Sequence, residues 1–328
     1  MCLSLNCGQT GTQSRDTLAP VRIDDKWGYI DPSGELRIEP QFNDAWPFSE
    51  GLAPVLVGDK WVYIDAAGRT VLDHSRDGKT FRSASFFCGG LASVLVDEGC
   101  GYIDKTGALV IAPNFPSCGD FCEGLAPARS GDMWGFIDKS GAFVIEPRFE
   151  GVGHFSEGLA AARTQGRCGY IGHDGTYAIK PQFEAAFGFR EGLAAVQVPS
   201  EGGIQGYFGF INKTGQFVLA PEYMSAGSFE QGLAPVMTQS GSPKYSYVNE
   251  RGHETIGPLF DGADTFSGKR AAVLVGLDHD NTMKLLQQQR SGAPIGLWGF
   301  IDSTGTIVVD ARFEEVKQFT SVASTFRR

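Results

Sequence analysis

The side chains best suited to chemistry in this sequence are three arginines that each follow a short apolar run. They are Arg22, Arg129 and Arg163. A guanidinium at the end of a strand can hold an anionic ligand through paired hydrogen bonds. The alternative interpretation is a solvated strand end with no ligand. If the chain closes into a ring, we expect these arginines to approach the mouth of its central channel.

A second group of candidate residues lies in a long insertion toward the C-terminus. Asp278, His279 and Asp280 carry acid–base and metal-binding groups, and the helix-like run from Met283 to Arg290 follows them. No second histidine stands at ligand spacing from His279, whereas a zinc site normally needs four converging ligands. We therefore treat Asp278, His279, Asp280 and Arg290 as candidate binding residues and predict no metal site.

Carboxylates recur along the chain in two fixed contexts. An aspartate precedes a turn that ends in glycine, as in Asp138 to Gly141, and a glutamate stands in Glu-Gly-Leu, as at Glu157. Aspartate in such a turn accepts backbone N–H groups, and near-identical repeats do not supply the two unlike carboxyl environments of acid–base catalysis. No nucleophile elbow, phosphate-binding glycine loop or His-Glu-x-x-His motif is present in the sequence. We predict no enzymatic activity and no cofactor.

All of these residues belong to a repeat, and the repeat must position them. Its units start with Leu-Ala or a variant of it, 34 to 40 residues apart, near residues 18, 52, 91, 125, 159, 193, 233 and 270. Each unit continues with a strand such as Trp134 to Asp138, a turn ending in glycine, a β-branched run and a closing aromatic such as Phe155. Most units also have Pro-x-aromatic after the β-branched run. Glycine in the turn predicts a hairpin, and proline predicts an edge strand.

The composite unit Trp-Gly-Tyr/Phe-Ile-Asp-x-Ser/Thr-Gly, followed by Pro-x-Phe and Phe-Ser-Glu-Gly-Leu-Ala, resembles the WG-repeat (KWG-repeat) family of bacterial β-repeat proteins. The resemblance extends from Leu18 to the C-terminus. It weakens where Tyr245-Ser246 replaces Trp-Gly and where Arg270 replaces leucine. It implies an all-β array with a binding or scaffolding role and no catalytic residues to transfer.

Two architectures fit an all-β repeat protein with eight units of three to four short antiparallel strands. A β-propeller is favoured, because Leu-Ala-Pro-Val and its variants have the small side chains that suit the strand nearest the axis. The alternative is an open β-solenoid or superhelical stack of hairpins, which a partial ninth strand near Val322 would favour. We divide the chain into a flexible leader, residues 1–17, and a single array, residues 18–328.

The repeat also assigns roles to aromatic and cysteine residues. The recurring tryptophans are predicted to form the core between units, with a ligand-stacking platform as the alternative. Trp46 is found in one unit only and is predicted to be exposed. Cys100 and Cys168 replace an aromatic residue and are predicted to be small apolar fillers. Cys118 and Cys122, with Cys88, are the candidates for a disulfide or a metal site.

Composition limits the class of partner. The chain has 328 residues and a formal net charge of -10, which argues against a nucleic-acid surface because phosphate binding draws on clustered Lys and Arg. No apolar run reaches the roughly 18 residues of a membrane span. The first residues lack the features of a signal peptide, so a cytoplasmic location is the default, with a secreted or periplasmic one open if the N-terminus is truncated. We expect a monomer.

Three functions follow, in order of preference. The first is a non-enzymatic scaffold that binds a protein partner on the face carrying the expanded loops 198–207, 238–244 and 276–297. The second is a module for a small anionic ligand or a glycan. The third is a hydrolase or lyase with a site assembled from several repeats.

Overall fold

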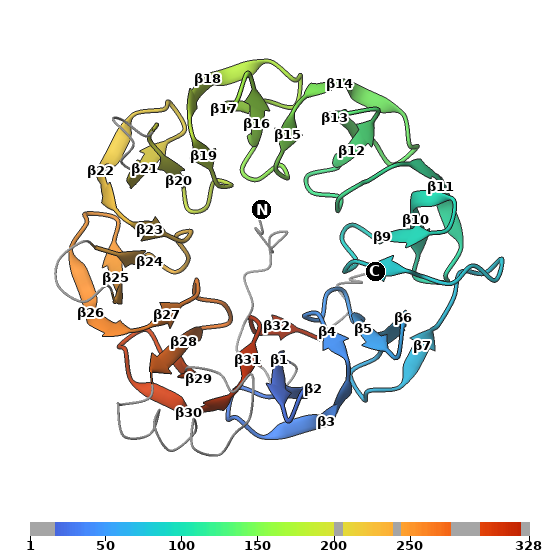
Figure 1. The fold of residues 1–328 in the computed structure, drawn as a ribbon, viewed down its shortest axis with the longest axis horizontal. Coiled ribbons are helices and arrows are strands. Elements are labelled where there is room, and N and C mark those ends of the chain that lie inside the picture. The colour runs from blue at the N-terminus through green and yellow to red at the C-terminus, as the bar shows by residue number, and fades with distance from the viewer. Residues whose placement is uncertain (1–16, 200–205, 239–243, 277–295, 323–328) are drawn as a thin grey trace, which may run out of the picture.

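The chain folds into a closed ring of small β-sheets around a central opening (Figure 1). The computed structural model describes residues 17–199, 206–238, 244–276 and 296–322. Eight antiparallel sheets form the blades of a β-propeller, which confirms the predicted ring and rules out the open stack. No helix in the described residues is long and apolar enough to cross a membrane.

We label the blades A to H in chain order and give the strands of each from the axis outward. Blade A contains β31 (Glu315–Val316), β1 (Thr17–Ile23), β2 (Lys26–Ile30) and β3 (Leu36–Phe42), with β32 (Thr320–Ser321) also paired to β1. Blade B contains β4 (Asp44–Ala45), β5 (Ala53–Val57), β6 (Lys60–Ile64) and β7 (Thr70–Leu72). Blade C contains β8 (Ser83–Ala84), β9 (Leu91–Val96), β10 (Gly99–Asp104) and β11 (Leu109–Phe115). Blade D contains β12 (Ala126–Ser130), β13 (Met133–Ile137) and β14 (Phe143–Phe149).

The second half of the ring repeats this arrangement. Blade E contains β15 (Gly151–Val152), β16 (Ala160–Thr164), β17 (Arg167–Ile171) and β18 (Tyr177–Phe183). Blade F contains β19 (Ala185–Ala186), β20 (Leu193–Gln197), β21 (Phe208–Asn212) and β22 (Phe217–Tyr223). Blade G contains β23 (Ser225–Ala226), β24 (Leu233–Met237), β25 (Tyr245–Asn249) and β26 (Glu254–Phe260). Blade H contains β27 (Gly262–Ala263), β28 (Ala271–Gly276), β29 (Gly296–Ile301) and β30 (Ile307–Phe313).

The strand nearest the axis is not the one that the sequence predicts. In seven blades the Leu-Ala strand is second from the axis, and the innermost place is taken by a two-residue strand from the end of the preceding unit, as β4 pairs with β5 (Figure 1). In blade D an isolated bridge between Cys118 and Ala128 takes this place. A strand of two residues relieves the crowding at the axis. The blade and the sequence repeat are therefore out of phase by one strand.

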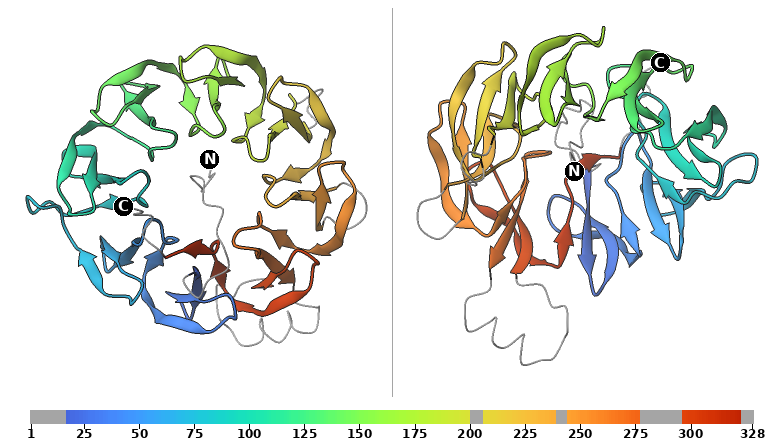
Figure 2. Two further views of the ribbon diagram at one scale, coloured as in Figure 1. Left: turned by 180° about the vertical axis from the view of Figure 1, so that it is seen from behind. Right: turned by 45° about the horizontal axis from the view of Figure 1, so that its top comes forward.

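The same offset closes the ring. The last unit supplies β31, which pairs with β1 through Val21 opposite Val316, and β32, which places Ser321 opposite Thr17. The two ends of the described chain thus meet in blade A, where the blue and red segments lie side by side in both views of Figure 2. Pairing leaves no open sheet edge between the last blade and the first.

The backbone of the outermost strand lies so close to each Trp-Gly pair that only glycine fits at the second position. In blade D the register between β13 and β14 shifts around the proline of the outer strand, and this brings backbone close to Gly135. A Cβ there would lie 2.3 Å from the carbonyl oxygen of Ile145 and 2.8 Å from the nitrogen of Pro147. Blade B has Val62 at this position, and its β7 is only three residues long and lacks the proline.

Neighbouring blades are tied together by the Glu-Gly turns that follow the innermost strands. Glu157 and Gly158 have φ values of 55° and 86°, a conformation that glycine adopts easily and glutamate does not. The Glu157 carboxylate accepts a hydrogen bond of 3.1 Å from Gly192 N in the equivalent turn of the next blade, and Lys213 Nζ lies 3.1 Å from it. The glutamate therefore acts as a clasp between blades, in addition to its predicted place in a turn.

One boundary between blades is covalent. A disulfide joins Cys100, on β10 of blade C, to Cys118, which lies next to Ala128 at the inner edge of blade D. The predicted role of Cys100 as an apolar filler is therefore wrong, and Cys118, a candidate for pairing with Cys122, is bonded to Cys100 instead. In every other blade except E, which has Cys168, an aromatic residue occupies the position of Cys100, so a covalent bond here replaces side-chain packing.

Candidate functional site

One face of the ring carries all the connections between the second and third strands of the blades, and we call it the turn face. In blades A to E these connections are short, for example Asp24–Asp25 between β1 and β2 and Gln165–Gly166 between β16 and β17. In blades F, G and H they expand to residues 198–207, 238–244 and 277–295. The strand ends that these three connections join all lie on the turn face, as the sequence predicts. Most of their residues lie outside the described part of the chain, including Asp278, His279, Asp280 and Arg290.

The three predicted arginines lie on the Leu-Ala strands β1, β12 and β16, one residue before the strand end that leads to the turn face. Arg22 is neutralised by acidic side chains, because it bonds to Asp25 at 2.7 Å and to Glu315 at 2.5 Å across the closing strand. Arg129 pairs with Asp132 in its own turn at 2.7 Å. Each of these two guanidiniums is therefore paired with a carboxylate.

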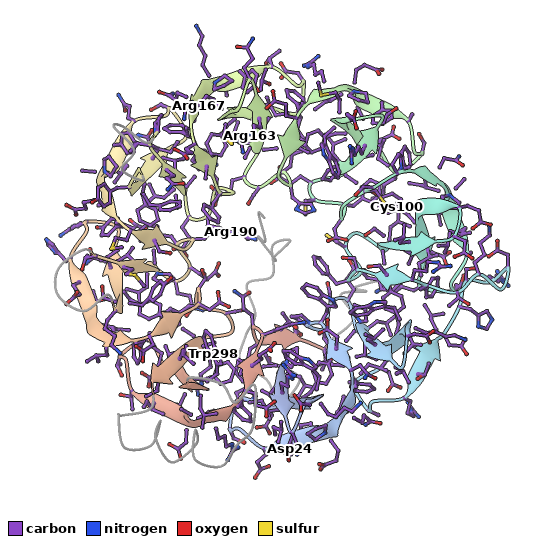
Figure 3. The ribbon with its side chains drawn as sticks, viewed as in Figure 1. Asp24, Cys100, Arg163, Arg167, Arg190 and Trp298 are labelled. Atoms are coloured by element: carbon purple, nitrogen blue, oxygen red, sulfur yellow. A yellow bond between two sulfur atoms is a disulfide. The ribbon has the colours of Figure 1, made fainter. Side chains whose placement is uncertain are left out.

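Arg163 differs from the other two. Its turn is Thr164-Gln165-Gly166-Arg167, so no acidic residue stands where Asp25 and Asp132 stand. Arg163 Nη2 donates to the Gly166 carbonyl oxygen at 3.0 Å, and within the described residues no carboxylate forms an ion pair with Arg163. The side chain is exposed. Figure 3 shows Arg163 and Arg167 over the same blade E.

A cavity of about 300 Å³ lies beside Arg163, around the inner strand of blade E. Its walls come from three consecutive blades, with Trp134 from blade D and Ala186 from blade F. Blade E contributes Gly151, Val152, Gly153, Ala161, Ala162, Arg163 and Cys168. The walls are therefore mainly apolar, with an aromatic ring and a guanidinium as the distinguishing groups. None of the described residues that line it carries a carboxylate or an imidazole.

Comparison with blade H shows how the cavity arises. In blade H a Cβ on Gly262 would lie 3.2 Å from the Trp298 ring and 3.0 Å from Leu274. The equivalent position in blade E is Gly151, where a Cβ would meet nothing within 4 Å. Cys168 stands in the place of Trp298, and Arg163 stands in the place of Leu274. The loss of one indole opens the space.

Trp46 lies where blades A and B meet and is half-buried. Lys317 Nζ lies 4.1 Å from the centre of the Trp46 ring and 4.6 Å from that of Trp27, a cation–π arrangement. The same ammonium donates to the Asp44 carboxylate at 2.9 Å and the Ala45 carbonyl at 2.6 Å. Burial lowers the pKa of Lys317, although the bond to Asp44 opposes this effect. One face of Trp46 is thus occupied by a cation of its own chain.

The recurring aspartates form turns, as their context predicts. Asp138 Oδ1 accepts hydrogen bonds from the Ser140 N–H at 2.8 Å, the Ser140 hydroxyl at 2.5 Å and the Ala142 N–H at 3.3 Å. The bond from the Ser140 hydroxyl, with the backbone bonds, holds the pKa of Asp138 below its ordinary value. Within the described residues no group of three or more His, Cys, Asp or Glu side chains is placed to hold a metal ion.

Family comparison gives the repeat its name. A family model described as WG containing repeat matches residues 27–61, 101–134, 134–168, 169–198, 208–239, 245–276 and 298–321. The chain belongs to this WG-repeat family. Its matched segments cover most of the ring, and the blade E cavity lies at residues matched by three of them. No curated protein matches this WG-repeat chain.

Among solved structures, this WG-repeat propeller is similar to a crystal structure of the eukaryotic initiation factor, with a TM-score of 0.54 and 13% sequence identity over 96% of this chain and 100% of that one. It is also similar to BamB from Moraxella catarrhalis, with a TM-score of 0.49 and 12% identity over 78% of this chain and 92% of that one. At such low identity the first likeness shows the propeller fold alone.

Proposed function

We propose that this WG-repeat protein is a non-enzymatic scaffold that binds a protein partner on its turn face. The observation that supports the proposal most strongly is the position of the three expanded connections. They follow one another in blades F, G and H and leave the strands of those blades in the same register as in blade E. Loops on a rigid frame are the usual place for recognition residues.

The test replaces each expanded connection by the short Gln165–Gly166 turn of blade E. Proteins captured by the wild type are identified by mass spectrometry, purified, and measured for direct binding to each variant. Arg69→Ala is the control, because Arg69 lies beside the β6–β7 turn on the opposite face and pairs with Asp65. We expect loss of binding in at least one shortened variant and none in the control. Equal binding by all variants would refute the proposal.

A small-ligand or glycan module is the second candidate, and the blade E cavity is the observation that favours it. Indole rings stack on sugars and on aromatic ligands, and cavities that bind small molecules span about 300–1,000 Å³. A glycan and metabolite screen by thermal shift tests this function. A ligand that raises the melting temperature of the wild type but not of Cys168→Trp would support it.

A further inference from the structure

We propose that the blade E cavity receives an apolar side chain of the protein partner while Arg163 binds an adjacent Asp or Glu of the same peptide segment. The proposal rests on the proposed function and names the chemistry that the partner must present. It combines three properties of the site: its volume, its charge and its position on the ring.

The volume suits a single side chain. At about 300 Å³ the cavity is at the lower limit for small-molecule sites, and an indole fills the corresponding space in blade H, where the Trp298 ring packs on Gly262. An aromatic or branched aliphatic side chain from outside can take the place of the indole that Cys168 lacks. Its apolar atoms would contact Trp134, Val152 and Ala186.

The charge around the cavity is opposite to that of the whole protein. The formal net charge is -10, and the other short connections carry carboxylates at Asp25, Asp59, Asp97 and Asp132. The β16–β17 connection carries none and is followed by Arg167, which, like Arg163, forms no ion pair with a described residue.

One carboxylate does lie close to this connection. Glu150 Oε2 accepts a hydrogen bond from the Gly166 N–H at 2.9 Å, so a backbone donor, and not a guanidinium, holds it. The Arg163 head group thus remains available to a carboxylate from a partner, and a guanidinium binds a carboxylate through paired, charge-assisted hydrogen bonds.

The position favours a peptide over a free small acid. Blade F, whose inner strand supplies Ala186, carries the first expanded connection of the turn face, in which Val198 N donates to the Tyr207 carbonyl at 3.0 Å. A peptide that lies on the turn face beside Val198 and Tyr207 can therefore reach the cavity at one end. The partner segment would place an apolar residue directly beside Asp or Glu.

The test starts from a phage-displayed random dodecapeptide library, selected in parallel on the wild type and on Cys168→Trp, which restores the residue of the equivalent blades. Phe208→Trp is the control, because it introduces tryptophan at the equivalent position of blade F, outside the cavity. We expect peptides that are retained by the wild type and the control but not by Cys168→Trp, and that share an apolar residue beside Asp or Glu. Gly151→Leu is a second filling variant in case Cys168→Trp melts at a lower temperature.

A synthetic peptide of the selected sequence is then titrated by fluorescence anisotropy. We expect Arg163→Leu to weaken binding about fivefold at low salt, with a smaller effect at high salt, and Arg129→Leu to leave it unchanged. Equal retention by Cys168→Trp, or no effect of Arg163→Leu, would overturn the proposal. So would 3-phenylpropanoic acid binding as tightly as the peptide. If the shortened connections abolish partner binding but Cys168→Trp does not, the proposed function survives and this inference fails.

Discussion

Breaking the disulfide between Cys100 and Cys118 tests how much the covalent link between blades C and D stabilises the ring. The two cysteines are 18 residues apart. For a closed loop of this length, the entropy that the cross-link removes from the unfolded chain corresponds to about 3 kcal/mol of stability. For 328 residues, an unfolding entropy of about 2.1 cal/mol/K per residue converts this loss into a melting temperature lower by about 4–5 °C.

The measurement is calorimetric unfolding of the wild type with and without a phosphine reductant, with thiols counted by Ellman's reagent to confirm reduction. The double variant Cys100→Ser/Cys118→Ser should melt near the reduced wild type and should not respond to the reductant. A reduced wild type that melts at the same temperature as the oxidised protein would refute the reasoning, because the link would then constrain nothing in the unfolded chain.

Three further changes test the contacts of the ring. Gly135→Ala should lower the free energy of unfolding by about 3 kcal/mol, since overpacking against backbone is costly, whereas Gly151→Ala should be nearly neutral in denaturant titrations; equal effects would contradict the steric argument. Glu157→Gly suits the positive φ but removes the hydrogen bonds to Gly192, so we expect the free energy of unfolding to fall by about 1 kcal/mol in the same titrations. A gain in stability would show that the hydrogen bonds between these blades are unimportant. The pKa of Asp138 is lowered on folding, so its stabilising effect is present above its ordinary value of 3.8 and is lost as the pH falls through the lower folded value. The advantage of the wild type over Asp138→Asn at pH 7, measured by thermal melts, should therefore shrink below about pH 4, and a constant difference would contradict this.

Much of the fold is predictable because the repeat carries its own turn chemistry. The glycines that end the hairpin turns, such as Gly141 with φ of 84°, mark the hairpin in every unit, and the prolines of the outer strands mark the third strand in most units. The innermost strand has no such marker. Two residues such as Asp44 and Ala45 show no alternation, so the sequence pattern predicts the Leu-Ala strand at the axis in their place.

The site was only partly predictable. The sequence shows that Arg163 lacks an acidic partner in its own turn. An aspartate follows Arg22 and Arg129 by three residues, whereas Gly166 stands at that place after Arg163. The sequence contains one signal of the cavity, a cysteine at residue 168 where other blades have tryptophan, but this pattern alone predicts a small apolar side chain that fills the position. Whether a smaller residue fills a space or opens one depends on how far it lies from the side chains of the neighbouring blades. The sequence alone does not give that distance. The disulfide escaped prediction for the same reason.

The closure of blade A has a consequence for synthesis of the chain. β1 is made before the strands of the other seven blades, and its inner neighbours β31 and β32 are made after them. Chains lengthen at about 5–20 residues per second, so blade A waits with one strand edge unpaired while those seven blades are synthesised. An unpaired edge is a template for association with other chains. The nascent chain is therefore exposed to aggregation at β1 until β31 and β32 complete the blade.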